Sequence, residues 1–188
     1  ILARGHGVVS AARPPEGARA PLGGRAEGPR GQVCSDRFQQ LLALYADYAA
    51  VLDAGDWERW PEFFTADCRY RVQPRENFDQ GLPLCTMAFE SQGMLRDRVY
   101  GISHTLFHEP YYQRHVIGVP RVLDDLGETI KVEANYAVFR TKPSEPSTVF
   151  NVGRYLDSVR VTDQCLRFED KLVIFDSELI ANSLIYPL

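Results

Sequence analysis

Cysteine, signature loops and long apolar runs are scarce or missing in this sequence, and each shortage excludes a class of protein. The four cysteines are Cys34, Cys68, Cys85 and Cys165, and no two of them form a Cys-x-x-Cys pair. We therefore expect reduced thiols in a cytoplasmic protein rather than a disulfide framework. No apolar run approaches the ~18 residues that cross a bilayer, so no membrane segment is expected. The motifs GxGxxG, P-loop and GxSxG are absent, which removes the strongest sequence signs of nucleotide binding and serine hydrolysis.

Charge of one sign is never concentrated in a long block. The formal net charge is −4, so we expect no nucleic-acid partner. The exception to an ordinary composition is the start of the chain, where the first 33 residues are rich in Gly, Pro, Ala and Arg and show no helical or strand period. Such a segment buries too little apolar surface to offset its ordering entropy. We predict a disordered extension over residues 1–34 and a single domain over residues 35–188.

Three helices are predicted in the first half of this domain. Ser35 or Asp36 caps the first, which Gly55 ends. Asp56 caps a short second helix over residues 57–64, and a third covers residues 90–102. The first helix carries apolar side chains at helical spacing on one face, namely Phe38, Leu41, Leu42, Tyr45, Ala49 and Leu52.

Strands are predicted over residues 68–73 and then, after a loop at 74–83, over residues 111–123, 128–142, 147–161 and 166–176. Pro120 marks an edge or a bulge, and a slip in alternation near Gly153 suggests another bulge. Helices followed by long antiparallel strands predict an α+β fold in which a strongly bent sheet wraps on the helices. We expect polar side chains on the outward face to form ion pairs with symmetry mates, namely Arg154, Asp157, Arg160, Arg167 and Glu169.

The stretch DAGDWERWPEFFTADCRYRV concentrates aromatic residues just before the first strand. Its aromatic side chains, Trp57, Trp60, Phe63 and Phe64, could form the mouth of a pocket or the packed end of a core. Their spacing already fits the apolar face of a helix, which favours a packed core.

Histidine is the residue that would carry metal chemistry here, and there are four. No cysteine is followed by a histidine at the spacing of a Rieske cluster. His104 and His108 have the i, i+4 spacing of helical metal ligands, and Glu109 follows, but we expect the helix to end near Ile102. Two polar loop or interface histidines are therefore the favoured interpretation, and His6 falls in the extension.

A catalytic alternative rests on His115, which lies in a strand expected to line the interior. Asp47 or Asp53 on the first helix could pair with it as a general acid/base, and Tyr45 and Tyr48 could donate hydrogen bonds. The competing interpretation, which we favour, is that Arg114 and His115 satisfy backbone groups or interface carboxylates. We therefore assign no catalytic, cofactor-binding or metal-ligating residue.

Five motifs carry a family resemblance: DWERWPEFFTADCRYRV, MLRDRVYG, YYQRHVIGVPRV, VFNVGRYLDSV and LRFEDKLVIFDSELIANSLIYPL. Over residues 36–188 the chain resembles the small (beta) subunits of Rieske-type aromatic-ring-hydroxylating dioxygenases. Their fold is the cystatin-like cone shared with scytalone dehydratase, ketosteroid isomerase and nuclear transport factor two. Within that family AVLDAGDWERWPEFFT, QPRENFDQGLPLC and NSLIYPL most resemble the small subunit of salicylate 5-hydroxylase. The small subunit of terephthalate dioxygenase is a looser match.

The resemblance implies a structural subunit within a hexamer of three large (alpha) and three small subunits. The large subunit would carry a Rieske 2Fe-2S cluster and a mononuclear iron, with electrons arriving from NADH through a reductase and a ferredoxin. The aliphatic tail, Leu184, Ile185 and Leu188, should not stand free in water. We expect it to pack into a neighbouring subunit or into the core of its own chain.

Overall fold

The computed structural model describes residues 31–162, 165–177 and 184–188. The expected disorder of residues 1–30 and the position of His6 lie outside these ranges. Helix α1 spans Gly31–Ala54, so it begins four residues before the expected cap. The nearest proline before it is Pro29, and nothing between that proline and Ser35 prevents the helix from extending.

A short 3₁₀ helix, η1 (Trp57–Phe63), follows α1 and leads into strand β1 (Phe64–Pro74). The loop expected over residues 74–83 contains a five-residue helix, α2 (Arg75–Asp79), and a short strand, β2 (Met87–Phe89), follows it; the sequence predicted neither element. Helix α3 spans Gln92–Tyr100, with its N-cap Ser91 accepting from the Met94 amide. It continues as a π-helical turn, η2 (Gly101–Thr105), so the expected end near Ile102 is wrong.

The sheet contains all seven strands of the described residues. Strand β3 spans Tyr112–Ile117, β4 Arg121–Asp125, β5 Thr129–Thr141, β6 Thr148–Val161 and β7 Leu166–Phe175. Their order is β2-β1-β7-β6-β5-β3, with β4 paired to β5 as well. Strands β1 and β7 run parallel and the other pairs are antiparallel. Gly118–Pro120 divides the single strand expected over 111–123 into β3 and β4, because proline cannot donate to the ladder.

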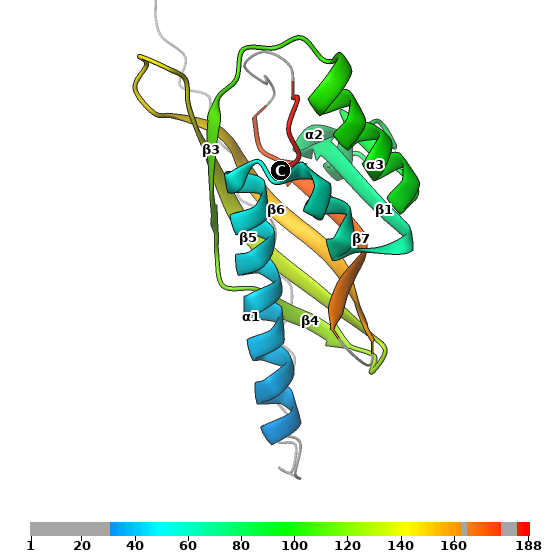
Figure 1. Cartoon of the computed structure of the whole chain (residues 1–188). Helices are drawn as coiled ribbons and strands as arrows, with labels where there is room; N and C mark the ends of the chain where they lie inside the picture. Colours follow the sequence, from blue (N-terminus) through cyan, green and yellow to red (C-terminus); the bar gives the residue numbers. More distant parts are fainter. Residues whose placement is uncertain (1–30, 163–164, 178–183) are drawn as a thin grey trace, which may run out of the picture.

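Helix α1 lies along one face of the curved sheet, which we call the inner face, with η1, α3 and the C-terminal end near its upper end (Figure 1). Apolar and polar residues alternate in the sequence of β5, which predicts one buried face, and this is confirmed, since Ile130, Val132, Ala134, Tyr136 and Val138 are all buried. They pack with the apolar face of α1, including Leu41, Tyr45, Tyr48 and Leu52, into one core. Within the described ranges no helix is long and apolar enough to span a bilayer.

Gly153 is not a bulge, because it pairs in regular register with Tyr136 on one side and Phe175 on the other. The extra residues lie at Phe150, between the partners of Val138 and Phe139, and at Glu169, between the partners of Ser158 and Val159. Glycine is required at 153 for a different reason. A Cβ there would lie 1.9 Å from the backbone oxygen of Ile174, so the two strands approach too closely for any side chain.

Replacing Gly153 with alanine should therefore destabilise the chain by more than about 2 kcal/mol, because backbone and not a flexible side chain must move. The matched control is Gly93→Ala in α3, where the nearest atom to a new Cβ is Ser91 Oγ at 3.6 Å. That change should be neutral or stabilise by up to about 1 kcal/mol. Urea unfolding of the two variants checks this, and equal midpoints would refute the explanation.

Candidate functional site

The aromatic residues of the 57–64 region form packed core. Trp60 and Phe64 are fully buried, their rings meeting edge to face at 5.8 Å, and Trp60 lies at 5.2 Å from Tyr70. Trp57 is partly buried and stacks on Tyr186 at 4.6 Å. The interpretation as a packed core is confirmed for Trp60 and Phe64, whose rings are covered by other rings and leave no room for a ligand.

A buried ion pair lies at the centre of this core. Lys171 Nζ donates to Asp157 Oδ2 at 2.9 Å, and both side chains are fully buried. The Tyr45 hydroxyl donates to the same carboxylate oxygen at 2.5 Å. Burial raises the pKa of Asp157, and Lys171 opposes that shift; burial lowers the pKa of Lys171. Asp157 was expected on the outward face, and this expectation is wrong, since its register partner Val132 belongs to the inner face.

Aromatic rings surround the Lys171 ammonium. It lies 3.5 Å from the ring centre of Tyr155, 4.4 Å from Phe168, 4.8 Å from Tyr48 and 5.2 Å from Tyr45. Cation–π attraction is strongest where water is excluded, so these rings replace part of the lost hydration. The pair is closed on all sides, which suits a structural role rather than chemistry on a substrate.

The C-terminal residues pack into the core of their own chain rather than standing free. Leu184 is almost fully buried and Leu188 fully so. The backbone oxygen of Leu188 accepts from the hydroxyls of Tyr48 at 2.8 Å and Tyr70 at 3.2 Å, and the Leu188 amide donates to Tyr70. Arg98 donates to the backbone oxygens of Leu184 and Ile185. The tail therefore fills the upper end of the interior, where an open cone would keep a pocket.

His115 and Asp53 do meet. His115 Nδ1 lies 2.7 Å from Asp53 Oδ1, and the His115 amide donates to both carboxylate oxygens. The His115 side chain is fully buried, and its Nε2 has no hydrogen-bond partner among the described residues. Arg114 lies 3.6 Å from the same carboxylate. Asp53 thus ties the end of α1 to the edge strand β3.

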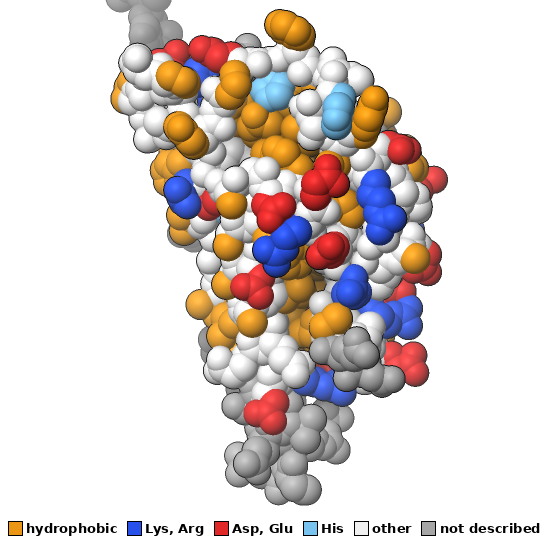
Figure 2. All heavy atoms as spheres, in the orientation of Figure 1, with side chains coloured by type: hydrophobic (Ala, Val, Ile, Leu, Met, Phe, Trp, Pro, Cys, Tyr) orange, Lys and Arg blue, Asp and Glu red, His pale blue; other side chains and the backbone are white. Residues whose placement is uncertain are grey.

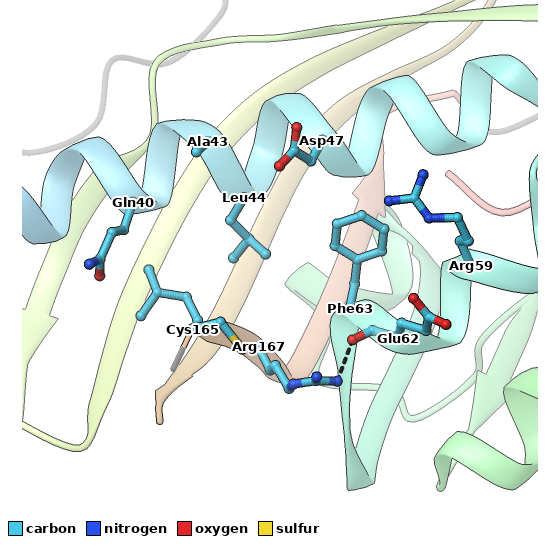
Figure 3. Close-up of a pocket in the computed structure, with 10 residues that line it drawn as sticks. Gln40, Ala43, Leu44, Asp47, Arg59, Glu62, Phe63, Cys165 and Arg167 are labelled. Atoms are coloured by element: carbon cyan, nitrogen blue, oxygen red, sulfur yellow. Dashed lines mark hydrogen bonds between the residues drawn. The ribbon is translucent and has the colours of Figure 1, made fainter. Parts of the chain in front are cut away.

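The other groups proposed for an acid/base site are dispersed. The Tyr45 hydroxyl donates a hydrogen bond to Asp157 and the Tyr48 hydroxyl donates one to the backbone oxygen of Leu188, so neither hydroxyl is bonded to His115. Asp47 lines a separate open groove of about 380 Å³ between α1, η1 and the start of β7. Figure 3 shows Leu44 and Phe63 facing each other across this groove and Arg167 bonded to the backbone oxygen of Glu62. Figure 2 shows the molecule in the orientation of Figure 1. Acidic and basic side chains alternate over the middle of the face seen there, with hydrophobic surface between them.

His104 and His108, the remaining histidines of the described residues, do not converge on a metal site. His104 belongs to the π-helical turn η2, where its ring stacks on Tyr100 at 4.4 Å and Nδ1 lies 3.2 Å from the Tyr100 oxygen. His108 Nε2 lies 2.7 Å from the Tyr186 hydroxyl. In the part of the chain that the structure describes, no three His, Cys, Asp or Glu side chains gather as a metal site would require. Burial also raises the pKa of the Cys68 thiol to about 11, which makes it a poor ligand or nucleophile.

Comparisons with known proteins agree with this geometry. The sequence matches the ring hydroxylating beta subunit family over residues 48–182. It is 36% identical to the anthranilate 1,2-dioxygenase small subunit of Burkholderia cepacia, covering 79% of this chain and 92% of that protein. It is 31% identical to a beta subunit of terephthalate 1,2-dioxygenase from a Comamonas species, covering 79% and 97%.

Solved structures place the same fold in the same family. A beta subunit from Novosphingobium aromaticivorans, assigned to an aromatic-ring-hydroxylating dioxygenase, superposes with a TM-score of 0.78 at 32% identity, covering 84% of this chain and 100% of that one. A protein of the same organism assigned as a scytalone dehydratase shares the fold alone, with a TM-score of 0.60 at 15% identity over 82% and 95% of the two chains. The cystatin-like α+β cone is confirmed.

This chain belongs to the ring-hydroxylating beta subunit family. It is the small subunit of an aromatic-ring-hydroxylating oxygenase, an oxidoreductase that acts as a complex.

Two further predictions concern stability at this site, and the first comes from the buried pair. Asp157→Ala should destabilise by about 3–5 kcal/mol, because it leaves the Lys171 ammonium uncompensated. Replacing both, as Asp157→Leu with Lys171→Met, should cost much less, since no buried charge remains. Asp79→Ala is the control for an exposed pair with Arg75 and should cost about 1 kcal/mol or less. Urea unfolding checks all three, and an Asp157→Ala cost equal to the control would contradict this assignment.

The tail yields a second. Tyr70→Phe removes the hydroxyl that contacts both the amide and the oxygen of Leu188, so we expect a loss of about 1–3 kcal/mol. Tyr112→Phe, at a ring that is 74% exposed, should change stability by less than about 0.5 kcal/mol. Thermal unfolding distinguishes them, and indistinguishable melting temperatures would show that the tail contributes nothing through Tyr70.

Proposed function

We propose that this chain is a non-catalytic structural subunit that holds the large, iron-bearing subunit of its oxygenase in an assembled, active arrangement. The observation that carries the proposal is the closed interior. The groups that could act as acid, base or cation in this fold, His115 and the Lys171–Asp157 pair, are buried and already engaged within the chain. A subunit whose polar groups are used internally offers its partner a rigid surface.

The proposed assembly is a hexamer of three large and three small subunits in the cytoplasm. The large subunit would hold the Rieske 2Fe-2S cluster and the mononuclear iron, and NADH would supply electrons through a reductase and a ferredoxin. Support comes from the relatives, whose printed names are those of dioxygenase small or beta subunits. The residues described here do not suit either iron centre, since no three candidate ligands come together among them.

For the substrate we propose salicylate, hydroxylated to gentisate, from the resemblance of residues 50–65, 73–85 and 182–188 to salicylate 5-hydroxylase small subunits. The named relatives act on anthranilate and terephthalate, which are also aromatic carboxylates. Because the substrate would bind on the large subunit, turnover by the whole complex is the measurement that identifies it.

A second candidate is a free-standing lyase or isomerase using His115 and Asp53. One observation favours it: Asp53 holds Nδ1 at 2.7 Å and leaves Nε2 without a partner among the described residues, as a general base would require. Against it, the side chain has no exposed surface through which a substrate could reach Nε2.

His115→Asn separates these functions, because the asparagine amide can still donate to Asp53 while Nε2 is removed. In a complex co-purified with its large subunit, we expect oxygenase turnover of salicylate per assembled complex to stay within about twofold of wild type. The chain alone should convert nothing. Light scattering reports the assembly and product analysis the turnover. Loss of turnover in a fully assembled complex, or turnover by the small subunit alone, would favour the catalytic role.

A further inference from the structure

Three polar side chains are buried on the inner face of the sheet, rather than standing on the opposite, outer face. Gln113 and His115 belong to the edge strand β3 and Asn151 to β6, and the three residues are 4%, 7% and 2% exposed. Four of their atoms have no hydrogen-bond partner among the described residues, namely Gln113 Oε1 and Nε2, His115 Nε2 and Asn151 Nδ2. Buried polar atoms of folded proteins are almost always paired, so four unpaired atoms in one region require an explanation.

The strand register places these side chains around Val138. His115 pairs with Val138 in β5, and Val138 pairs with Asn151 in β6, so the three residues form one row across the inner face. Gln113 precedes His115 by two residues and therefore points to the same face. Two strand spacings of about 4.8 Å separate the backbones of His115 and Asn151 by roughly 10 Å. A bridging molecule can reach both side chains at this separation, where no direct hydrogen bond joins them.

The Asp53 carboxylate fixes how His115 presents its ring. Its oxygens accept from the His115 amide at 2.9 and 3.1 Å, and Oδ1 lies 2.7 Å from Nδ1. We call this set of contacts the Asp53 clamp. Because an ionised carboxylate only accepts hydrogen bonds, Nδ1 carries the proton, and Nε2 of the neutral ring is an acceptor. The unpaired atom of His115 is thus held in one orientation inside the chain.

The four unpaired atoms supply donors and acceptors in equal number. His115 Nε2 and Gln113 Oε1 accept hydrogen bonds, whereas Gln113 Nε2 and Asn151 Nδ2 donate them. The Tyr136 hydroxyl already donates to Asn151 Oδ1, which leaves the amide nitrogen of Asn151 as the unpaired donor. A water molecule donates two hydrogen bonds and accepts two, so it matches this set. An anion would face two acceptors and a cation would face two donors, so neither suits it.

Aromatic rings close the interior beside these groups. Tyr111, two residues before Gln113, lies with its ring centre 5.9 Å from that of Phe150 and 4.6 Å from that of Tyr186. Trp57 stacks on the other neighbour of this row, with its ring centre 4.6 Å from that of Tyr186. Phe150 and Tyr186 are each 7% exposed. Large rings and so little exposed surface suit a molecule as small as water, which needs a cavity of only about 10–15 Å³.

We propose that Gln113, His115 and Asn151 enclose a permanent internal water site, with one or two water molecules that join the edge strand β3 to β6. This inference goes beyond the proposed function and does not depend on a large subunit. It gives His115 Nε2, the atom that a general base would use, a fixed structural partner. The water also links two strands that β5 keeps apart.

A high-resolution crystal structure of the full chain tests the site directly. We expect density for a water molecule within about 3.2 Å of His115 Nε2 and of at least one of the two amides. A site without density, or direct hydrogen bonds between the three side chains, would overturn the proposal. Density for a larger molecule, or for another side chain of the same chain at this position, would overturn it as well.

Gln113→Met gives a second test, because methionine is unbranched and of similar size but has no amide. If water is bound, the change removes two of its partners, and the melting temperature should fall. If the Gln113 amide is unpaired in the native chain, the change relieves a buried polar group, and an unchanged or raised melting temperature would contradict the proposal. Gln40→Met, at an exposed side chain of α1, is the matched control and should leave the melting temperature unchanged. The wild-type crystal structure decides the question if Gln113→Met does not fold.

Discussion

The rest of this structure depends on the Lys171–Asp157 pair. Two opposite charges buried at 2.9 Å tolerate no slip in register, because moving either strand by one residue would turn one charge to the outer face and leave the other unpaired. The extra residue at Glu169 determines which side chains of β7 point inward. Because of it, Lys171, Val173 and Phe175 follow Phe168 on the inner face. The aromatic rings around the ammonium come from both α1 and the sheet, so the same pair fixes the helix against its strands. Such a pair contributes specificity of packing more than net stability.

The C-terminal residues Leu184–Leu188 fill the upper end of the interior, above the ion pair. In an open cone the upper end of the sheet would leave tyrosine hydroxyls and a guanidinium facing a cavity. Here the backbone of Leu184–Leu188 accepts hydrogen bonds from the hydroxyls of Tyr48 and Tyr70 and from one terminal nitrogen of Arg98. A fold shared with dehydratases does not by itself assign their chemistry to this chain, because function depends on the particular groups of the site and not on the fold.

Sequence reasoning recovered what depends on local periodicity. The alternation of β5 and the apolar face of α1 predicted the core, and the pairing of His115 with a carboxylate of the first helix was foreseen as a possibility. Lys171 was missed, because apolar residues recur at every second position but one from Leu166 to Ile174 and suggest a single regular strand, which hides the extra residue at Glu169. Asp157 was misplaced on the outer face, although its spacing from Tyr155 and Val159 already gave its inward phase. Gly153 was correctly marked as special but for the wrong reason, since close approach of two backbones is a tertiary fact that one strand's sequence does not contain.

The two faces of the sheet differ in what covers them, since the inner face packs against α1 and the outer face lies opposite it. On the inner face, the buried charges of Lys171 and Asp157 are paired within the chain, whereas the Tyr155 hydroxyl and Asp157 Oδ1 have no hydrogen-bond partner among the described residues. On the outer face, apolar residues next to Arg114 are left unmatched. The clamp from Asp53 joins the two, since the same carboxylate holds the β3 backbone and lies beside the arginine that projects outward.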